Sequence, residues 1–532
     1  MNRQTSDRLA QAETLFALRN PKAYPAAAFE DAWISTLLYS EHTWGAWCSV
    51  SDPERKETLE QWEIKKSYAE QADKQSQALL AQALKTDGAS TGAGSAVDVF
   101  NTLSWPRTEL VRLSRALSAA GDRVLDAAGQ PVPSQRLNSG DLVFLANAVP
   151  PLAAARFTVT AGAAHAVGRA TAVGNILDNG VVRVRVDEKT GGIAELTARD
   201  LTGNFADTSG GEALNDYLYL PGDDLKNLKR NGPVTIRGGE QGPLVASLII
   251  ECDAPGCRKL TRELRLVAGQ DYVECINTVD KERLQAKSYK RPEGKESVNF
   301  AFPFAVPGGE VWLDLPLGLM RPEADQMPSA CKNWFTVGRY ADVSAADCGV
   351  TLVTLDAPLL QVGGLTATLL ESQTNPDVWL KEVKPTQRLY SWAMNNHWGT
   401  NYRAYQEGPT VFRFILRPHG RRDPASATRF ATGFSQPLIP APASGEQFAG
   451  KPLLTVEPPE VIVQSLKPSD DGKALIVRLF NPSAAAQTAS VKWGTAPPRI
   501  SLSNTSEQPG AAVNGALTLP SQGLVTLRAE LP

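Results

Sequence analysis

The chain is poor in the residue types that most often hold metals in proteins. It has 4 histidines and 6 cysteines among 532 residues, and no two cysteines form a CxxC pair. A zinc ribbon is therefore a poor explanation of the cysteines, and compact motifs such as HExxH are also absent. A zinc site made within this chain alone would need ligands gathered from separate elements. The cysteines are expected to be reduced and buried, although Cys252 and Cys257 flank the turn sequence DAPG and could face each other across a hairpin.

Other absences narrow the function classes. No apolar run approaches the roughly 18 residues that a membrane helix needs, and a net charge of −3 without a basic stripe makes nucleic acid an unexpected partner. There is no GxSxG elbow and no glycine-rich phosphate loop. The N-terminus lacks the apolar segment of a signal peptide and enters a helical pattern at once, which favours a chain that begins inside something larger. The compartment stays open.

Residues 1–90 are expected to form a helical bundle. Phe29, Trp33 and Leu37 recur at i, i+4 and i+8, which predicts one broad apolar stripe on a helix. A second helix is expected to start at Asp52–Pro53, because Asp caps free backbone N–H groups and Pro suits the first helical position. It would extend to about Lys85. The residues expected on its buried side are Leu59, Trp62, Ala69, Ala72, Leu79 and Ala83.

After residue 96 the apolar period changes from 3.6 to 2, which predicts strands. VVRVRV (181–186), DEKTGG and IAEL read as strand, turn and strand, and so predict a hairpin. Segments 86–96 and 435–452 are rich in small residues or proline and are expected to be linkers. The fold class is therefore mainly β, with multiple β-sandwich domains behind an N-terminal helical segment. The expected domains are a bundle (1–90), a small sandwich (97–170), a large sandwich (175–435) and a C-terminal sandwich (453–532).

Two segments have the composition of a carbohydrate site. MNNHWGTNYRAYQEG (394–408) gathers amides, aromatic rings and an arginine, and DQMPSACKNWF (325–335) is similar. Amides and arginine match sugar hydroxyls, and an aromatic face suits the apolar side of a pyranose. The alternative is that Trp398 and Trp334 belong to the sandwich core and that the amides form turns.

A series of motifs in the same order resembles glycoside hydrolase family 38, the zinc-dependent α-mannosidases, in its bacterial branch. The resemblance runs from about Leu9 to the C-terminus and rests on the following segments: LLYSEHTWGAW, QWEIKKSYA, VFNTLSWPRTELV, NDYLYLPGDD, RPEADQMPSACKNWF, VTLVTLDAPLLQVGGLTA, NNHWGTNYRAYQEGPTVFRFILRPHG and VEPPEVIVQSLKPSDDGKALIVRLFNP.

The resemblance implies a catalytic barrel, then a helical bundle, then several β-sandwiches. It implies retaining hydrolysis by two acids, one of them an Asp nucleophile, with a zinc ion that orients the sugar. By position, His42 in EHTWG matches one zinc ligand of the family, while Thr43 stands where some relatives have Asp. No catalytic residue is expected in this chain, since the nucleophile and the other zinc ligands belong to the barrel. Asn396, Asn401 and Tyr402 are the expected sugar contacts.

The sequence thus predicts the C-terminal portion of an α-mannosidase that hydrolyses terminal α-D-mannosidic bonds and is inactive alone. Expected partners are an α-mannoside oligosaccharide, one Zn²⁺ with most ligands outside this chain, a separately encoded barrel and further copies of the chain. One alternative is a non-catalytic carbohydrate-binding or scaffolding protein. Another is a complete enzyme with an acid pair near residues 325–407, about 5–5.5 Å apart if it is retaining.

Overall fold

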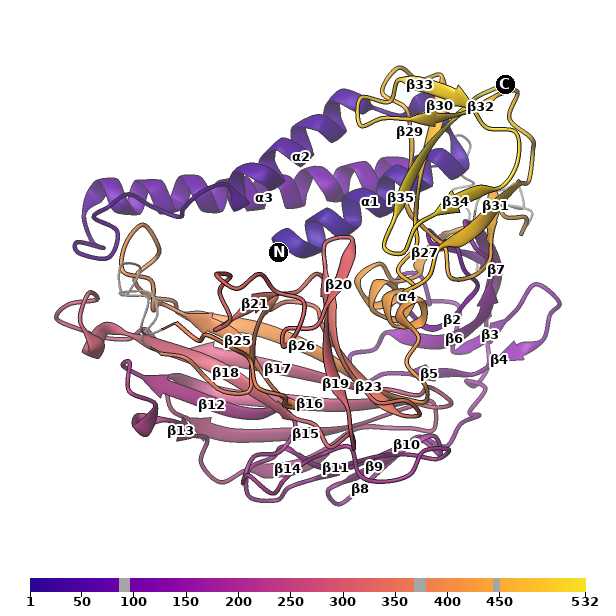
Figure 1. Cartoon of the computed structure of the whole chain (residues 1–532). Coiled ribbons are helices and arrows are strands. Elements are labelled where there is room, and N and C mark those ends of the chain that lie inside the picture. Colours follow the sequence, from indigo (N-terminus) through magenta and orange to yellow (C-terminus); the bar gives the residue numbers. More distant parts are fainter. Residues whose placement is uncertain (86–95, 368–378, 444–449) are drawn as a thin grey trace. The chain divides into compact units, whose positions relative to one another are not determined.

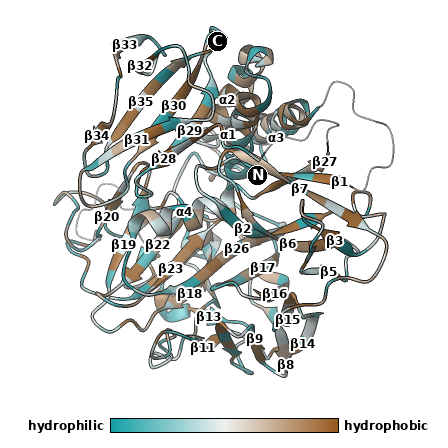
Figure 2. Cartoon of the chain, turned by 90° about the vertical axis from the view of Figure 1, so that its right-hand side faces the viewer, coloured by the Kyte–Doolittle hydropathy of each residue, from teal (hydrophilic) through white to brown (hydrophobic). Residues whose placement is uncertain are grey.

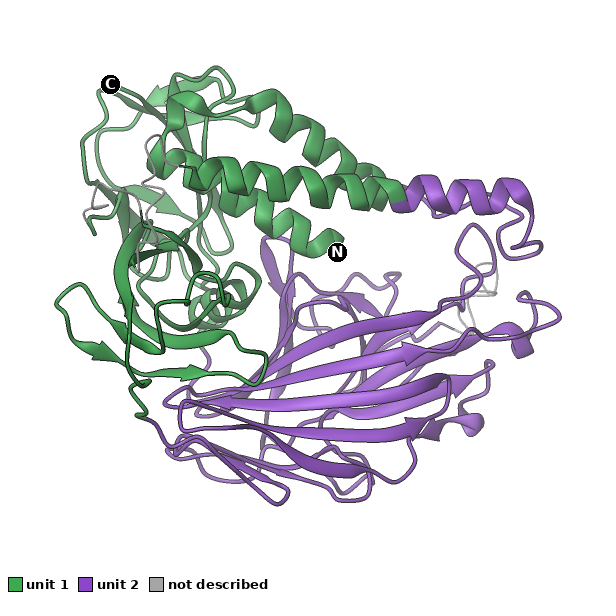
Figure 3. Ribbon diagram, turned by 180° about the vertical axis from the view of Figure 1, so that it is seen from behind, with its two compact units in different colours: residues 1–40, 67–167, 423–532 green, residues 41–66, 168–422 purple. Residues whose placement is uncertain are grey.

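The computed structural model describes residues 1–85, 96–367, 379–443 and 450–532, so the predicted linker at 86–96 lies almost wholly outside the described residues. The chain divides into two compact units, each assembled from distant stretches (Figure 3). Unit 1 comprises Met1–Ser40, Ser67–Val167 and Asp423–Pro532, and unit 2 comprises Glu41–Lys66 and Gly168–Arg422. The predicted class is confirmed: antiparallel sheets dominate and follow N-terminal helices (Figure 1). Among the described helices, none is long and apolar enough to cross a membrane.

The helices are α1 (Asn2–Arg19), α2 (Ala26–Ser40), α3 (Lys56–Leu84) and α4 (Pro424–Ser435), with 3-10 turns at Pro21–Ala23, Leu225–Asn227 and Pro292–Gly294. The expected start of α3 at Pro53 is wrong by three residues. The Asp52 carbonyl accepts from the Arg55 N–H at 3.2 Å and from the Thr58 hydroxyl at 3.3 Å, so the residues before Lys56 form turns instead. The expected buried side of α3 is confirmed except at Leu59, which is 37% exposed. The buried residues are Trp62, Ala69, Ala72, Leu79 and Ala83.

Helix α1 is an internal element of unit 1. Leu9, Ala12 and Leu15 have no exposed surface, and they share an apolar cluster with Phe29 of α2 and Leu79 of α3. The stripe expected on α2 is only partly buried. Its N-terminal half packs through Phe29, whereas Leu37 is 64% exposed.

Unit 1 also contains four antiparallel sheets among its described residues, with strand orders β27-β1-β7-β3-β4, β2-β6-β5, β28-β31-β34 and β29-β30-β35-β32-β33. Their bounds are β1 (Ala96–Asn101), β2 (Arg107–Leu113), β3 (Arg123–Leu125), β4 (Pro131–Val132), β5 (Ser134–Arg136), β6 (Leu142–Val149), β7 (Ala153–Thr160), β27 (Ile439–Pro442), β28 (Leu454–Glu457), β29 (Ile462–Pro468), β30 (Ala474–Phe480), β31 (Gln487–Trp493), β32 (Ile500–Ser503), β33 (Pro509–Ala512), β34 (Leu517–Leu519) and β35 (Leu524–Glu530).

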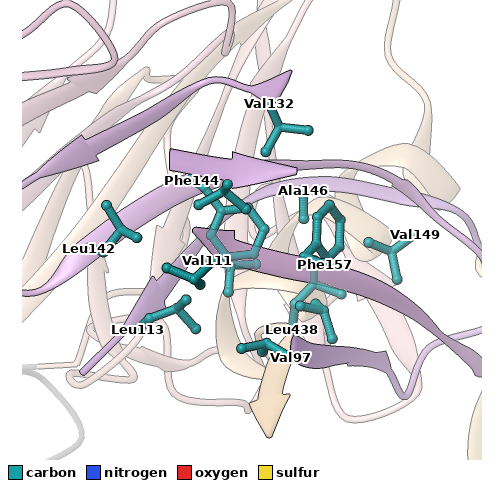
Figure 4. Close-up of a cluster of buried hydrophobic side chains, with 13 residues drawn as sticks. Val97, Val111, Leu113, Val132, Leu142, Phe144, Ala146, Val149, Phe157 and Leu438 are labelled. Carbon is teal, nitrogen blue, oxygen red and sulfur yellow. The ribbon is translucent and has the colours of Figure 1, made fainter. Parts of the chain in front are cut away.

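The first two of these sheets enclose an apolar core. Phe144 of β6 and Phe157 of β7 lie with ring centroids 4.8 Å apart at its centre, and Val111, Leu113 and Val97 surround them (Figure 4). A second core lies under the C-terminal strands, where β30 and β35 show apolar stretches (Figure 2). Each core forms because alternate residues of paired strands point to the same face.

Two features of this region differ from a simple run of strands and linkers. Residues 424–435 form α4, in a region where almost only strands were expected, and the Asp423 carboxylate accepts from the Ser426 N–H at 3.0 Å as a helix cap. The predicted linker 435–452 contains strand β27, which pairs with β1 from Val97↔Pro442 to Phe100↔Ile439. Within that segment, residues 444–449 lie outside the described residues.

Unit 2 is built from three antiparallel sheets among its described residues, with orders β11-β10-β9-β8, β13-β12-β18-β25-β24-β21 and β14-β15-β16-β17-β26-β23-β22-β19-β20. Their bounds are β8 (Thr171–Val173), β9 (Ile176–Asp178), β10 (Val182–Val186), β11 (Ile193–Ala198), β12 (Asp216–Pro221), β13 (Lys229–Arg230), β14 (Thr235–Gln241), β15 (Val245–Ala254), β16 (Cys257–Val267), β17 (Val273–Lys281), β18 (Glu296–Pro303), β19 (Glu310–Leu315), β20 (Gly318–Met320), β21 (Phe335–Thr336), β22 (Tyr340–Ser344), β23 (Gly349–Thr354), β24 (Leu359–Val362), β25 (Arg388–Asn395) and β26 (Gly408–His419).

The two larger sheets of unit 2 face each other as a sandwich. Phe300 of β18 lies 5.6 Å from Phe414 of β26, measured between ring centroids, and Phe302 lies 5.0 Å from the same ring. Asn215 and Asn277 exchange two side-chain hydrogen bonds of 2.9 Å across this core, so their buried amides are paired. The predicted hairpin is confirmed as β10 and β11, in register from Val182↔Ala198. Cys252 and Cys257 are buried on the β15–β16 hairpin as free thiols.

Candidate functional site

The segment around His42 follows α2 and belongs to unit 2. His42 is exposed, has the left-handed backbone φ of 48°, and makes no hydrogen bond to a described residue. Its neighbours are fixed: the Lys65 ammonium donates to the Glu41 carbonyl at 2.6 Å, and the Thr43 hydroxyl donates to the Gly45 carbonyl at 3.1 Å. A non-glycine residue in this backbone region is uncommon, and such strain concentrates at functional positions. The imidazole is therefore presented outward from a held turn.

Gly45 lets this turn approach α3. A Cβ at position 45 would lie 2.9 Å from the Ser49 Cβ and 3.2 Å from the indole nitrogen of Trp62. Real Cβ atoms are almost never as close as 2.9 Å to a neighbouring carbon, so a larger residue would force Ser49 and the turn to shift and would also crowd Trp62 of α3. The glycine of EHTWG is thus required by packing.

A cluster of aromatic and charged groups attaches the loop at 394–406 to the stretch at 41–66. Tyr405 packs edge-to-face on Trp62 at 5.5 Å between centroids, and its hydroxyl donates to the Glu54 carboxylate at 2.8 Å. The Arg283 guanidinium lies 3.5 Å above the Tyr405 ring and pairs with Glu54. Burial and then the Glu54 contact raise the pKa of Tyr405 to about 12, so its phenol stays a donor at neutral pH.

The His42 segment and the loop also meet directly. The Trp44 N–H donates to the Asn401 carbonyl at 3.1 Å, and the Thr400 hydroxyl donates to the Trp47 carbonyl at 3.4 Å. The structure therefore brings the predicted metal segment together with two of the predicted sugar contacts, Asn401 and Tyr402, which are consecutive in the loop.

The three predicted sugar contacts differ in availability. Asn396 is buried, and its amide serves the backbone: Nδ2 donates to the carbonyls of Gly294 and Ala404 at 2.7 Å each, and Oδ1 accepts from the Glu296 N–H at 2.6 Å. Asn396 therefore shapes the loop.

Asn401 and Tyr402 are partly exposed. The Asn401 Oδ1 accepts from Thr400 at 3.0 Å, while its Nδ2 has no hydrogen-bond partner among the described residues. The Tyr402 ring lies edge-to-face on Trp398 at 5.2 Å between centroids, and its hydroxyl likewise has no described partner. Both side chains can therefore bond a ligand without breaking an internal contact.

His397 of the same loop is a buried, neutral side chain. Its Nε2 lies 3.2 Å from the Gly222 carbonyl, which can only accept, so Nε2 carries the proton. Burial lowers the pKa of His397 to about 4, and Nδ1 has no hydrogen-bond partner among the residues that the structure describes. The fourth histidine, His419, is bonded at 3.0 Å to the buried carboxylate of Asp342, whose pKa is lowered by this contact against the opposing effect of burial.

The second predicted segment lies beside the same sheet. Trp334 packs on Trp392 of β25 and on Trp379, each at 5.7 Å between ring centroids. The Lys332 ammonium donates to three carbonyls of the loop before it, including that of Pro328 at 3.0 Å. Trp334 is thus a partly buried anchor, as the core alternative expected, and Met327 at the tip of this loop is 75% exposed.

Sequence reasoning missed a buried ion pair beneath the loop. Lys281, the last residue of β17, lies 2.8 Å from the Glu296 carboxylate, the first residue of β18, and the Tyr219 hydroxyl also donates to it at 2.8 Å. The sequence signal was Glu296, a charged residue directly before the mostly apolar run SVNFAFP (297–303).

The described residues of this chain do not bring a complete metal site together. No group of three or more of their His, Cys, Asp or Glu side chains could hold an ion. Among them, His42 could hold a metal only as a single ligand.

Comparisons with known proteins identify the architecture. The profile of the glycosyl hydrolases family 38 C-terminal domain matches residues 177–377, and that of the family 38 C-terminal β-sandwich domain matches residues 460–529. An α-mannosidase from Enterococcus faecalis V583 superposes with a TM-score of 0.69 at 15% identity, over 99% of this chain and 67% of that one. A glycosyl hydrolase family 38 protein from Enterococcus faecalis superposes with a TM-score of 0.69 at 16% identity, over 99% of this chain and 70% of that one. No curated protein sequence matches the chain.

These likenesses define a protein built from the β-sandwiches of a glycoside hydrolase. The two profile matches together cover just over half of the sequence. The chain belongs to glycosyl hydrolases family 38 and comprises C-terminal domains of that family.

Proposed function

We propose that this chain is the C-terminal part of a zinc-dependent α-mannosidase that hydrolyses terminal α-D-mannosidic bonds with retention. The observation that carries the proposal is the hydrogen bond of 3.1 Å from the Trp44 N–H to the Asn401 carbonyl. It fixes the EHTWG turn to the loop whose free polar groups suit a sugar. A zinc ligand and a sugar-contacting loop must lie together if the metal orients the substrate's hydroxyls.

In this proposal His42 supplies one zinc ligand, and the catalytic acids and the other ligands lie on a barrel outside this chain. Its exposure and its lack of an internal hydrogen bond support this role, because a neutral imidazole with a free nitrogen is a common metal ligand. Asn401 and Tyr402 contact the sugar. Asn396 acts on the sugar indirectly, by holding the loop.

The same proposal explains why the C-terminal half of α2 has an exposed apolar face: this face would pack against another protein domain. Ile34 and Leu37 are 46% and 64% exposed and lie three residues apart on one helical face. Exposed apolar patches of this kind commonly mark protein interfaces. The barrel is the partner that the family relationship favours for this face.

The test combines zinc content with hydrolysis of a chromogenic α-mannoside. The purified chain alone should hold no stoichiometric zinc and show no turnover. Adding the barrel of a family 38 relative, in trans or as a fusion, should give zinc binding and activity that His42→Ala lowers strongly. Turnover by the chain alone, with zinc that is lost on His42→Ala, would refute the external site. Sugar binding without activity in every combination would favour a non-catalytic binding protein.

A further inference from the structure

A small hollow is lined by the first residues of β18 and the last residues of β25. These two strands pair with each other in unit 2, and Figure 1 shows them side by side. The polar lining of the hollow includes Lys281, Glu296, Asn395 and Gln406, and Met394 adds an apolar surface. Asn396 also borders the hollow, but its side-chain amide already makes hydrogen bonds to backbone groups.

The Glu296 carboxylate is only half used by the protein. Its Oε2 receives both Lys281 and the Tyr219 hydroxyl, at 2.8 Å each. Its Oε1 accepts no hydrogen bond from a described residue. It is nevertheless not fully enclosed, because part of its surface remains exposed. Oε1 is therefore accessible, and the hollow is the space that this otherwise buried side chain borders.

Two amides beside it are equally unused. The Gln406 side chain makes no hydrogen bond to any described residue, and Asn395 uses only Oδ1, which accepts from the His397 N–H at 3.3 Å. The hollow therefore presents a carboxylate oxygen that accepts and two amides that donate. Unpaired polar groups converging on a concavity are what a polar ligand site requires.

Charge and size restrict the ligand. Lys281 neutralises Glu296, so the hollow has no net charge to select an anion or a cation. Burial and then Glu296 raise the pKa of Tyr219, which therefore stays a protonated donor and leaves Oε1 as the open acceptor. The hollow admits about one water-sized group. It therefore has room for a single hydroxyl of a ligand and not for a whole sugar ring.

We propose that this hollow is a hydroxyl-recognition subsite that takes one hydroxyl of a neutral sugar, with Glu296, Gln406 and Asn395 as the contacting residues. A hydroxyl both donates and accepts, which matches a carboxylate next to amides. The inference rests on the proposed function, because that function supplies sugars as the ligand class. It assigns sugar contacts that differ from Asn396, Asn401 and Tyr402.

Direct binding to this chain alone tests the subsite without needing catalysis. Methyl α-mannoside is titrated at millimolar concentration and followed by saturation-transfer NMR, with glycerol as the comparison ligand. The variants are Gln406→Ala and Asn395→Ala, and the matched control is Gln285→Ala, an exposed glutamine of unit 2 with no described hydrogen bond. Thermal melts verify that all three remain folded.

We expect methyl α-mannoside to bind more tightly than glycerol, and each subsite variant to bind it about fivefold more weakly, as the loss of one hydrogen bond predicts, while Gln285→Ala binds normally. The inference is overturned if no binding occurs, if glycerol binds as well as the sugar, or if binding is unchanged in both subsite variants. None of these results decides the proposed function, because restored hydrolysis with an added barrel is a separate measurement.

Discussion

Replacing Asn396 by alanine separates a loop-shaping amide from a sugar contact. The Asn396 side chain makes three hydrogen bonds of 2.6–2.7 Å, and all of them go to backbone groups of Gly294, Glu296 and Ala404. Those groups lie on two different segments, so the amide joins the start of β18 to the far side of the loop. Alanine removes all three bonds at once.

The size of the effect follows from these bonds. A buried hydrogen bond contributes about 1 kcal/mol net, which gives a loss of about 3 kcal/mol in the free energy of unfolding. Buried backbone groups left without partners would raise this loss, and water entering the space would reduce it. At about 2 °C per kcal/mol for a unit of this size, the melting temperature should fall by about 6 °C.

The assay is thermal unfolding of the whole chain followed by calorimetry, in which unit 2 need not unfold together with unit 1. Gln406→Ala is the control, because this residue of the same loop makes no described hydrogen bond and should shift the transition by no more than about 1 °C. If Asn396→Ala melts like the control but loses sugar binding, then Asn396 contacts the sugar directly and the structural argument fails.

Three further outcomes are expected. Gly45→Ala should cost about 1–3 kcal/mol in thermal melts through steric overlap with Ser49 and crowding of Trp62, whereas Gly364→Ala, where nothing lies within 4 Å of the added Cβ, should not; equal melting would refute the packing argument. Because burial lowers the pKa of His397 from 6.5 to about 4, the unfolded chain binds a proton in this window that the folded chain does not. Stability therefore falls as the pH drops from about 6.5 to about 4, by on the order of 3 kcal/mol, and His397→Gln should lose less over the same range in melts from pH 7.5 to 4.5. Ile34→Lys with Leu37→Glu should leave melting within about 0.5 kcal/mol and weaken association with an added family 38 barrel in light scattering, and unchanged association would count against α2 as that interface.

The local parts of the fold were predictable, and the distant pairings were not. The β10–β11 hairpin follows from strict alternation around a tight turn, because register in a hairpin is set by nearby residues. By contrast, β1 pairs with β27, and Val97 faces Pro442. Nothing in PLIPAP marks it as a partner for a strand so far away, and its prolines favour a linker.

The same start signal had opposite outcomes at two places. Asp423–Pro424 begins α4, and the Asp423 carboxylate caps the Ser426 N–H. Asp52–Pro53 does not begin α3, because the Asp52 carbonyl is taken up by a turn. An Asp-Pro sequence permits a helix to start but does not determine that it will. Competing hydrogen bonds from the surrounding chain decide whether the helix begins there.

The candidate site shows the same limit at the level of single amides. Asn395 and Asn396 are adjacent and chemically identical, yet one lines a hollow with a free Nδ2 and the other is fully engaged with the backbone. The difference arises where the pairing of β25 with β18 ends. Asn395 is the last residue of β25 and pairs with Ser297 of β18, whereas the side chain of Asn396 accepts from the Glu296 N–H. Composition could identify the loop as rich in sugar-matching groups, but only the strand register determines which of those groups the protein has left unused. Binding residues on such a loop are therefore best assigned by whether the side chain keeps a donor or acceptor that no described residue uses. Asn396 keeps no such donor, whereas four residues do: Asn395, Asn401, Tyr402 and Gln406.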